Sequence, residues 1–97
     1  MALISGSNYT VVEGGSPGAW FTPTGTMFLA DVDNAAAVTI ETRRDSGDAN
    51  PKPLTDGLGP GGLRVLNGPC CVPVQCVAGR NYRYVAARGS AVCAADQ

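Results

Sequence analysis

The chain has 97 residues and a mass of 9.9 kDa, which limits it to one domain, because single cores are usually built from about 100 to 200 residues. Seven Lys and Arg residues against eight Asp and Glu residues give a net charge of -1, which excludes the basic surface that nucleic-acid binding or a polybasic membrane contact requires. Histidine is absent, which excludes sites that use a histidine base or imidazole ligands, so we expect no catalytic residue, no cofactor and no metal.

Residues 1–25 are expected to form an extended N-terminal arm. Gly and Pro residues, which interrupt hydrogen-bonded ladders, surround one short strand-like run of Tyr-Thr-Val-Val that begins at Tyr9. The start lacks the basic region of a secretory signal peptide, and no apolar stretch approaches the roughly 18 residues of a membrane span, so a cytoplasmic product is expected. We predict that the arm pairs with or lies over a neighbouring chain, and that residues 26–97 form a single β-sandwich domain.

Two strands are expected next. Thr26–Asp31 has the composition of a buried strand, and the Asp and Asn residues that follow it favour a turn. Ala36–Arg43 is the clearest strand, because its residues alternate along the chain with the period of two that a sheet with one wet face requires. The side chains of one face are Val38, Ile40 and Thr42, and those of the other are Thr39, Glu41 and Arg43.

Residues 45–62 are expected to form one long surface loop, with at most a short strand near Leu54. The segment holds three Pro, five Gly and three Asp residues and shows no apolar periodicity. Loops longer than about 12 to 15 residues in small domains are often functional, so this loop is a candidate contact surface. Arg43, Arg44 and Lys52 flank it, and they either form a solvated face or complement an acidic patch on a partner.

The last third of the chain predicts four more strands. They cover Leu63–Leu66, Cys71–Val77, Asn81–Ala87 and Ser90–Ala95, and Pro73 confines the second of them to an edge or a bulge. The spacing of the strands favours an all-β fold, a small Ig-like β-sandwich or barrel of six to seven strands. Low charge leaves the sheet edges unguarded, which favours assembly with neighbouring chains.

The four cysteines lack the paired spacing of a structural zinc site. If the turns at 78–80 and 88–89 close hairpins within one sheet, Cys76 and Cys93 lie on strands that flank a central one, about 9 to 10 Å apart. A disulfide requires Cα atoms within roughly 7 Å, so this register excludes that bond. Free thiols that serve as small core residues are expected, and an intersubunit bond from Cys70 or Cys71 stays open.

Six side chains are candidates for contacts with a partner. Trp20 and Phe21 form the only pair of large adjacent aromatic residues, which either seals the core or anchors the arm in a pocket of a neighbour. The basic residues near the long loop and the tyrosine of the first strand-like run complete the set. The candidates are Tyr9, Trp20, Phe21, Arg43, Arg44 and Lys52.

Three segments carry a resemblance to a known family. They are the Gly- and Pro-rich segment from Ile4 to Gly25, the strand Ala37–Thr42 followed by Asp-Ser-Gly-Asp at 45–48, and the closing segment Gly79–Ala86 before the last strand. In these features the chain resembles small virion proteins of tailed bacteriophages, especially capsid decoration (cement) proteins. The resemblance implies a β-sandwich, often trimeric, that resides in the virion, binds the major capsid protein or another virion protein, and reinforces the shell. A tail or neck component and a disulfide-stabilised secreted binding module are the alternatives.

Overall fold

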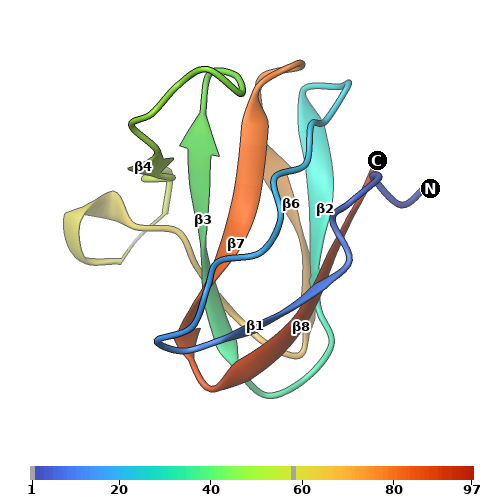
Figure 1. Cartoon of the computed structure of the whole chain (residues 1–97). Helices are drawn as coiled ribbons and strands as arrows, with labels where there is room; N and C mark the ends of the chain where they lie inside the picture. The colour runs from blue at the N-terminus through green and yellow to red at the C-terminus, as the bar shows by residue number, and fades with distance from the viewer. Residues whose placement is uncertain (1, 58) are drawn as a thin grey trace.

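The structure, a computed structural model, describes residues 2–57 and 59–97. It is an all-β sandwich of two antiparallel sheets packed face to face (Figure 1). The eight described strands are β1 (Tyr9–Val12), β2 (Met27–Val32), β3 (Ala37–Arg43), β4 (Lys52–Pro53), β5 (Val65–Asn67), β6 (Cys70–Gln75), β7 (Asn81–Arg88) and β8 (Ser90–Asp96). The predicted all-β fold is confirmed, and the strand near Leu54 is the two-residue β4.

Sheet A has the strand order β1-β8-β2-β6. In sheet B, β3 is central, with β7 along one side and the short strands β4 and β5 along the other. The strand that contains Pro73 therefore lies at an edge of sheet A, as predicted, because proline donates no hydrogen bond to a second neighbour.

The core lies between the two sheets and follows from the alternation of side chains along each strand. On β3, Val38 and Ile40 are completely buried, as the sequence pattern predicts. Aromatic rings fill the centre, where the Phe21 ring lies 5.4 Å from the rings of both Phe28 and Tyr84, measured between centroids. The hydroxyl of Tyr84, on sheet B, donates a 2.6 Å hydrogen bond to the carbonyl of Ala94 on sheet A, which ties the layers together.

The N-terminal segment corrects the expectation of a separate arm. β1 pairs with β8 of the same chain, from Tyr9 opposite Cys93 to Val12 opposite Ser90. Phe21 forms a bridge with Tyr82, and Ile4, Val11 and Phe21 are all buried in the core. These apolar side chains are removed from water when they pack against their own sandwich, whereas an extended arm would leave them exposed, so this segment is part of the folded body.

The two predicted hairpins are also wrong, because both turns lead from one sheet to the other. β6 belongs to sheet A, β7 pairs with β3 in sheet B, and β8 returns to sheet A. Gly89, with φ of 72°, allows the sharp change of direction between β7 and β8. Cys93 consequently lies opposite Tyr9 and Val32 rather than Tyr84.

Candidate protein-interaction site

Trp20, Arg43 and Arg83 form a stacked group on the outer face of sheet B, which we call the Trp20 cluster. The guanidinium carbons of both arginines lie 4.3 Å from the centre of the Trp20 ring system. A 2.7 Å ion pair joins Arg83 to Glu41, and Arg43 Nε donates a 2.9 Å hydrogen bond to Asn81 Oδ1. The cluster is thus a fixed, positively charged platform of the residue types that dominate protein interfaces.

The Trp20 cluster follows from the register of two adjacent strands. Glu41 lies opposite Arg83 and Arg43 opposite Asn81, so these side chains share the face that points away from the core. Sequence reasoning named Trp20 and Arg43 but missed Arg83 and Glu41 as partners. The alternation Asn-Tyr-Arg-Tyr at the start of β7 indicates the position of Arg83, because side chains alternate between the two faces of a strand. With the two tyrosines facing the core, Arg83 points outward.

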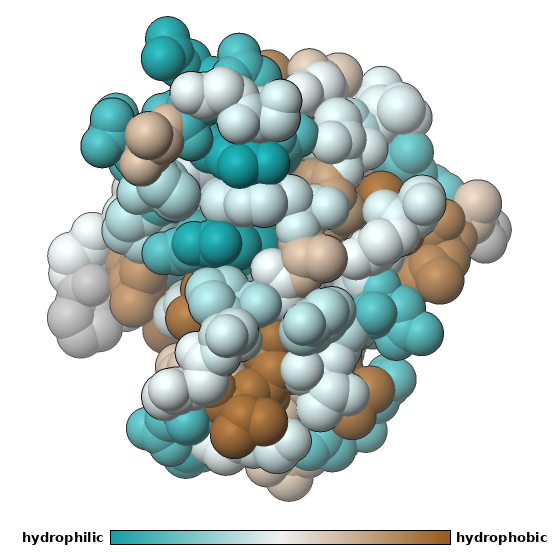
Figure 2. Space-filling view, viewed as in Figure 1, coloured by the Kyte–Doolittle hydropathy of each residue, from teal (hydrophilic) through white to brown (hydrophobic). Residues whose placement is uncertain are grey.

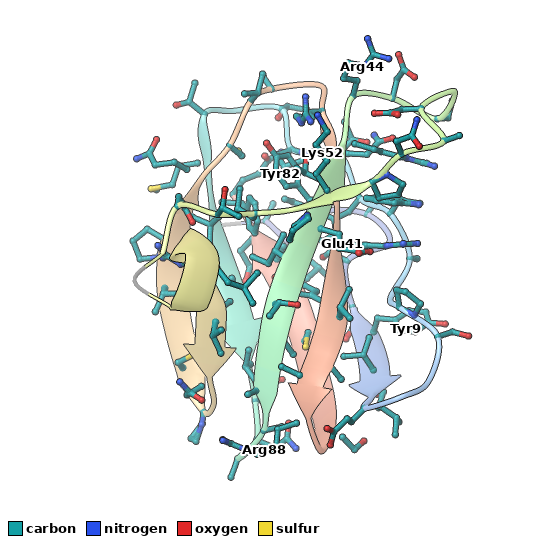
Figure 3. All side chains as sticks on the ribbon, turned by 90° about the vertical axis from the view of Figure 1, so that its left-hand side faces the viewer. Tyr9, Glu41, Arg44, Lys52, Tyr82 and Arg88 are labelled. Carbon is teal, nitrogen blue, oxygen red and sulfur yellow. The ribbon has the colours of Figure 1, made fainter. Side chains whose placement is uncertain are left out.

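The other predicted contact residues lie outside the Trp20 cluster. Arg44 is exposed and lies 3.8 Å from Asp48, and Lys52 is exposed on β4 at the same end of sheet B, whereas Tyr9 lies away from both (Figure 3). Phe21 is only 2% exposed, which corrects its assignment as a contact residue. Its ring packs against Phe28 and Tyr84 and cannot reach a partner from there.

We expect the replacement of Trp20 by alanine to lower the free energy of unfolding by about 1 to 2 kcal/mol, because two half-buried cation–π contacts of about 0.5 to 1 kcal/mol each are lost. Urea unfolding followed by circular dichroism measures this change. The variant Arg44→Ala, which removes an exposed arginine outside the cluster, is expected to change stability by less than about 0.5 kcal/mol. Equal effects of both replacements would contradict a stabilising role for the stack.

The outer face of sheet A exposes large apolar side chains from three strands and the N-terminal segment. We call this surface the apolar face; its residues, with their exposed fractions, are Leu3 (53%), Val12 (52%), Met27 (44%) and Val92 (37%). Each of them neighbours a buried residue in the chain, such as Val11 or Phe28, and so points outward by alternation. Figure 2 shows hydrophobic side chains among polar ones over the lower half of the molecule, where β1 and β8 lie.

Two carboxyl groups lie within the same face. Asp31 on β2 is opposite Ala94, and Asp96 on β8 is opposite Leu29, so the two acidic residues are diagonal neighbours. A hydrogen bond between them raises the pKa of Asp96 above its usual value. Cys71, opposite Asp31 on β6, has a thiol pKa raised by a hydrogen bond to Asp31. The face therefore combines apolar side chains with a small acidic centre.

The cysteines show no sign of nucleophilic activation. All four are free thiols, and Cys93 is buried in the core as expected, whereas Cys71 is exposed. Burial raises the thiol pKa values of Cys70, Cys76 and Cys93, which opposes the reactive thiolate. Among the described residues, no three Cys, Asp or Glu side chains are grouped to hold a metal ion. In the same part of the chain, no helix is long and apolar enough to cross a membrane.

Comparison of the chain with protein-family models, with curated proteins and with solved structures finds no match.

Proposed function

We propose that the protein is a structural virion protein of the decoration (cement) class, which binds the major capsid protein and reinforces the shell without catalysis. The observation that supports this proposal most is the apolar face, with four large apolar side chains exposed on one side of one sheet. Single exposed apolar residues are common on monomeric proteins, but several large ones on the same face of a sheet favour a surface that a partner covers.

The β6 and β7 edges offer less to a partner than the sheet faces do. At the β6 edge, Pro73 has no N–H group, and its carbonyl already accepts a 2.9 Å hydrogen bond from Arg64 Nη2. Along β7, the edge is covered by the chain itself, since Gly18 donates to the Tyr84 carbonyl and Phe21 exchanges backbone hydrogen bonds with Tyr82. We therefore place the contact with the shell on a sheet face, in contrast to the pairing of an N-terminal arm expected from the sequence.

We propose that several copies of the protein bind the shell together, arranged around a symmetry axis. Cyclic assemblies repeat one contact between copies, and a trimer on the shell, as the family resemblance implies, multiplies the binding strength of each copy. The Trp20 cluster lies on the opposite sheet from the apolar face, so one molecule can contact a capsid subunit with one sheet and a neighbouring copy with the other.

A charge placed in the apolar face tests the proposal. We expect Val92→Lys to weaken binding to purified capsid shells that lack the protein by at least about tenfold, because a buried, unpaired ammonium opposes association. Val65→Lys is the matched control, since Val65 is 38% exposed against 37% for Val92 and lies on the other sheet. Cosedimentation with shells measures the occupancy, and light scattering gives the native mass of the free protein.

Two results would count against the proposal. Wild-type protein that does not cosediment with shells excludes the decoration function. Shell binding that survives Val92→Lys and is lost in Val65→Lys moves the contact to the other sheet. If the unfolding midpoint of Val92→Lys falls far below that of wild type, the variant has a folding defect, and Val12→Lys, at a more exposed position of the same face, then decides the question.

A further inference from the structure

A cavity of about 390 Å³ opens between the two sheets on the side opposite to β1. It lies where β6 is the edge of sheet A and the two-residue β4 is the edge of sheet B, so neither strand has a neighbour to close the gap. The walls come from both sheets: β4 and the residues after it, the end of β6 with the turn that follows, and the inward faces of β3 and β7. Figure 3 looks onto this side, with Lys52 and Tyr82 near each other.

The lining of the cavity is mostly apolar. Leu54 packs against the core, the Tyr82 ring is almost completely buried, and Val77 is 63% exposed at the mouth. A volume of this size falls in the range of about 300 to 1,000 Å³ typical of ligand pockets and is close to its lower end. It accommodates one branched or aromatic side chain together with a small polar group.

The cavity has more hydrogen-bond donors than acceptors available to them. Thr42 Oγ1 donates to the Asn81 carbonyl at 2.9 Å and accepts from Arg80 Nε at 2.8 Å, so it is already satisfied. The Tyr82 hydroxyl accepts from the backbone N–H of Val77 at 2.9 Å, and within the described residues its own proton has no acceptor. The terminal nitrogens of Arg80 and the ammonium of Lys52 likewise have no ion-pair partner in residues 2–57 and 59–97.

Among the residues that the structure describes, no carboxylate lines the cavity to neutralise these two cations. The pKa of Asp48 is lowered, mainly by hydrogen bonds from the backbone N–H groups of Asn50 and Arg44. The positive charge of Arg80 makes a smaller contribution to the same shift. This carboxylate is therefore already engaged by its own loop. The cavity thus has two cations and one phenol proton that lack acceptors, and its floor is apolar. A ligand with a carboxylate attached to an apolar group is complementary to this arrangement.

We infer that this cavity binds a partner segment that ends in an apolar residue, with its C-terminal carboxylate held by Lys52, Arg80 and Tyr82. A terminal residue carries a carboxylate and a side chain on one carbon atom, so it fits a site where the donors and the apolar floor adjoin. The inference rests on the proposed function, because the bound segment is taken to come from a protein with which this chain assembles. It uses a part of the molecule separate from the apolar face.

The experiment is an NMR titration of the backbone amides of the full chain with short peptides. The probe is acetyl-Ala-Gly-Ala-Leu with a free carboxyl terminus, and the same peptide with an amidated terminus is its control. We expect saturable shifts at residues 52–55 and 75–80 with the acid, and at least about tenfold weaker binding for the amide, since charge-assisted hydrogen bonds are lost. Replacing the terminal Leu by Gly is expected to weaken binding by about tenfold or more, because its side chain is no longer buried.

Variants of the protein locate the site. Lys52→Gln, at an exposed position, is expected to weaken binding of the acid by about tenfold, and Lys52→Glu to abolish it. Arg44→Gln removes a nearby exposed arginine that does not line the cavity and is expected to leave binding unchanged. Unfolding midpoints close to that of wild type show that these variants fold.

Four outcomes overturn the inference. They are equal binding of acid and amide, no saturable shift at millimolar peptide, unchanged binding by Lys52→Glu, and binding of free acetyl-leucine as tight as that of the peptide. The last of these assigns the cavity to a small carboxylate rather than to a partner segment. None of these results depends on capsid shells, so failure here is distinguishable from failure of the decoration function.

Discussion

Replacing Phe21 with alanine is expected to lower the free energy of unfolding by about 3 to 5 kcal/mol, the usual effect of removing a buried aromatic ring. Phe21 is 2% exposed and contacts the rings of Phe28, Tyr82 and Tyr84. Small domains are stable by only about 5 to 15 kcal/mol, so this single change removes a large share of the total. Urea unfolding at neutral pH, followed by near-ultraviolet circular dichroism of the aromatic cluster, measures the loss.

The adjacent residue provides the control for this prediction. Trp20→Ala removes a larger aromatic ring one position earlier, but from a half-buried position outside the core, where its contacts are the two arginines of the Trp20 cluster. We expect Phe21→Ala to be the more destabilising by about 2 kcal/mol or more, in spite of the smaller side chain. If the two variants were equally stable, residues near 21 would not be part of the core, and the expectation of an arm detached from the body would be favoured instead.

This pair also shows where the sequence stops being informative. Both residues are large and aromatic, and the surrounding Pro and Gly residues leave no alternation that distinguishes an inward position from an outward one. The direction is determined by contacts distant in the chain, since the backbone of Phe21 pairs with Tyr82 and both Arg43 and Arg83 lie over the Trp20 ring. Local pattern alone therefore left both interpretations open.

Strands with clean alternation were predicted well. β3 has a buried Val38 and Ile40 and a polar outer face with Glu41, and its observed bounds, Ala37–Arg43, differ from the prediction by one residue. β7 and β8 were likewise predicted to within one residue of their bounds. An alternating apolar pattern fixes which face is buried, and this information is contained in the strand itself.

The pairing of those strands was not predictable in the same way. A short turn with glycine, such as Arg88-Gly89, permits a hairpin within one sheet and equally a corner between two sheets. The choice depends on β7 pairing with β3, where Tyr84 lies opposite Ile40. Such long-range pairing leaves no local trace, and the cavity between β4 and β6, which depends on it, was therefore not anticipated from the sequence either.

Alkaline pH is expected to destabilise the fold, because the buried thiol of Cys93 and the buried hydroxyl of Tyr84 resist ionisation in the folded state. Burial raises the pKa of the Cys93 thiol from 9.0 to about 12, and burial likewise raises the pKa of the Tyr84 hydroxyl above its usual value. Below pH 9 the thiol is protonated in both the folded and the unfolded state, so its contribution to stability is fully present. As the pH rises from 9 toward 12, the unfolded state loses this proton and the folded state keeps it, so stability falls.

The expected slope follows from proton linkage. One proton retained only by the folded state lowers the free energy of unfolding by about 1.4 kcal/mol per pH unit. Cys93 contributes this slope above pH 9, and Tyr84, which ionises near pH 10 when unfolded, steepens it from there. Urea unfolding in the presence of a reducing agent, at several pH values across this range, measures the slope directly.

Two cysteine variants separate Cys93 from the other thiols. Cys93→Ala removes the buried thiol, so we expect a lower stability at neutral pH but a shallower decline between pH 9 and pH 10, where tyrosine does not yet contribute. Cys71→Ala removes an exposed thiol and is expected to reduce the slope less than Cys93→Ala does, because Asp31 raises the Cys71 pKa but the thiol is not buried. An unchanged slope in Cys93→Ala would mean that the thiol opens to water in the folded state, and the packing of β8 against β1 and β2 would then be looser than the structure has it.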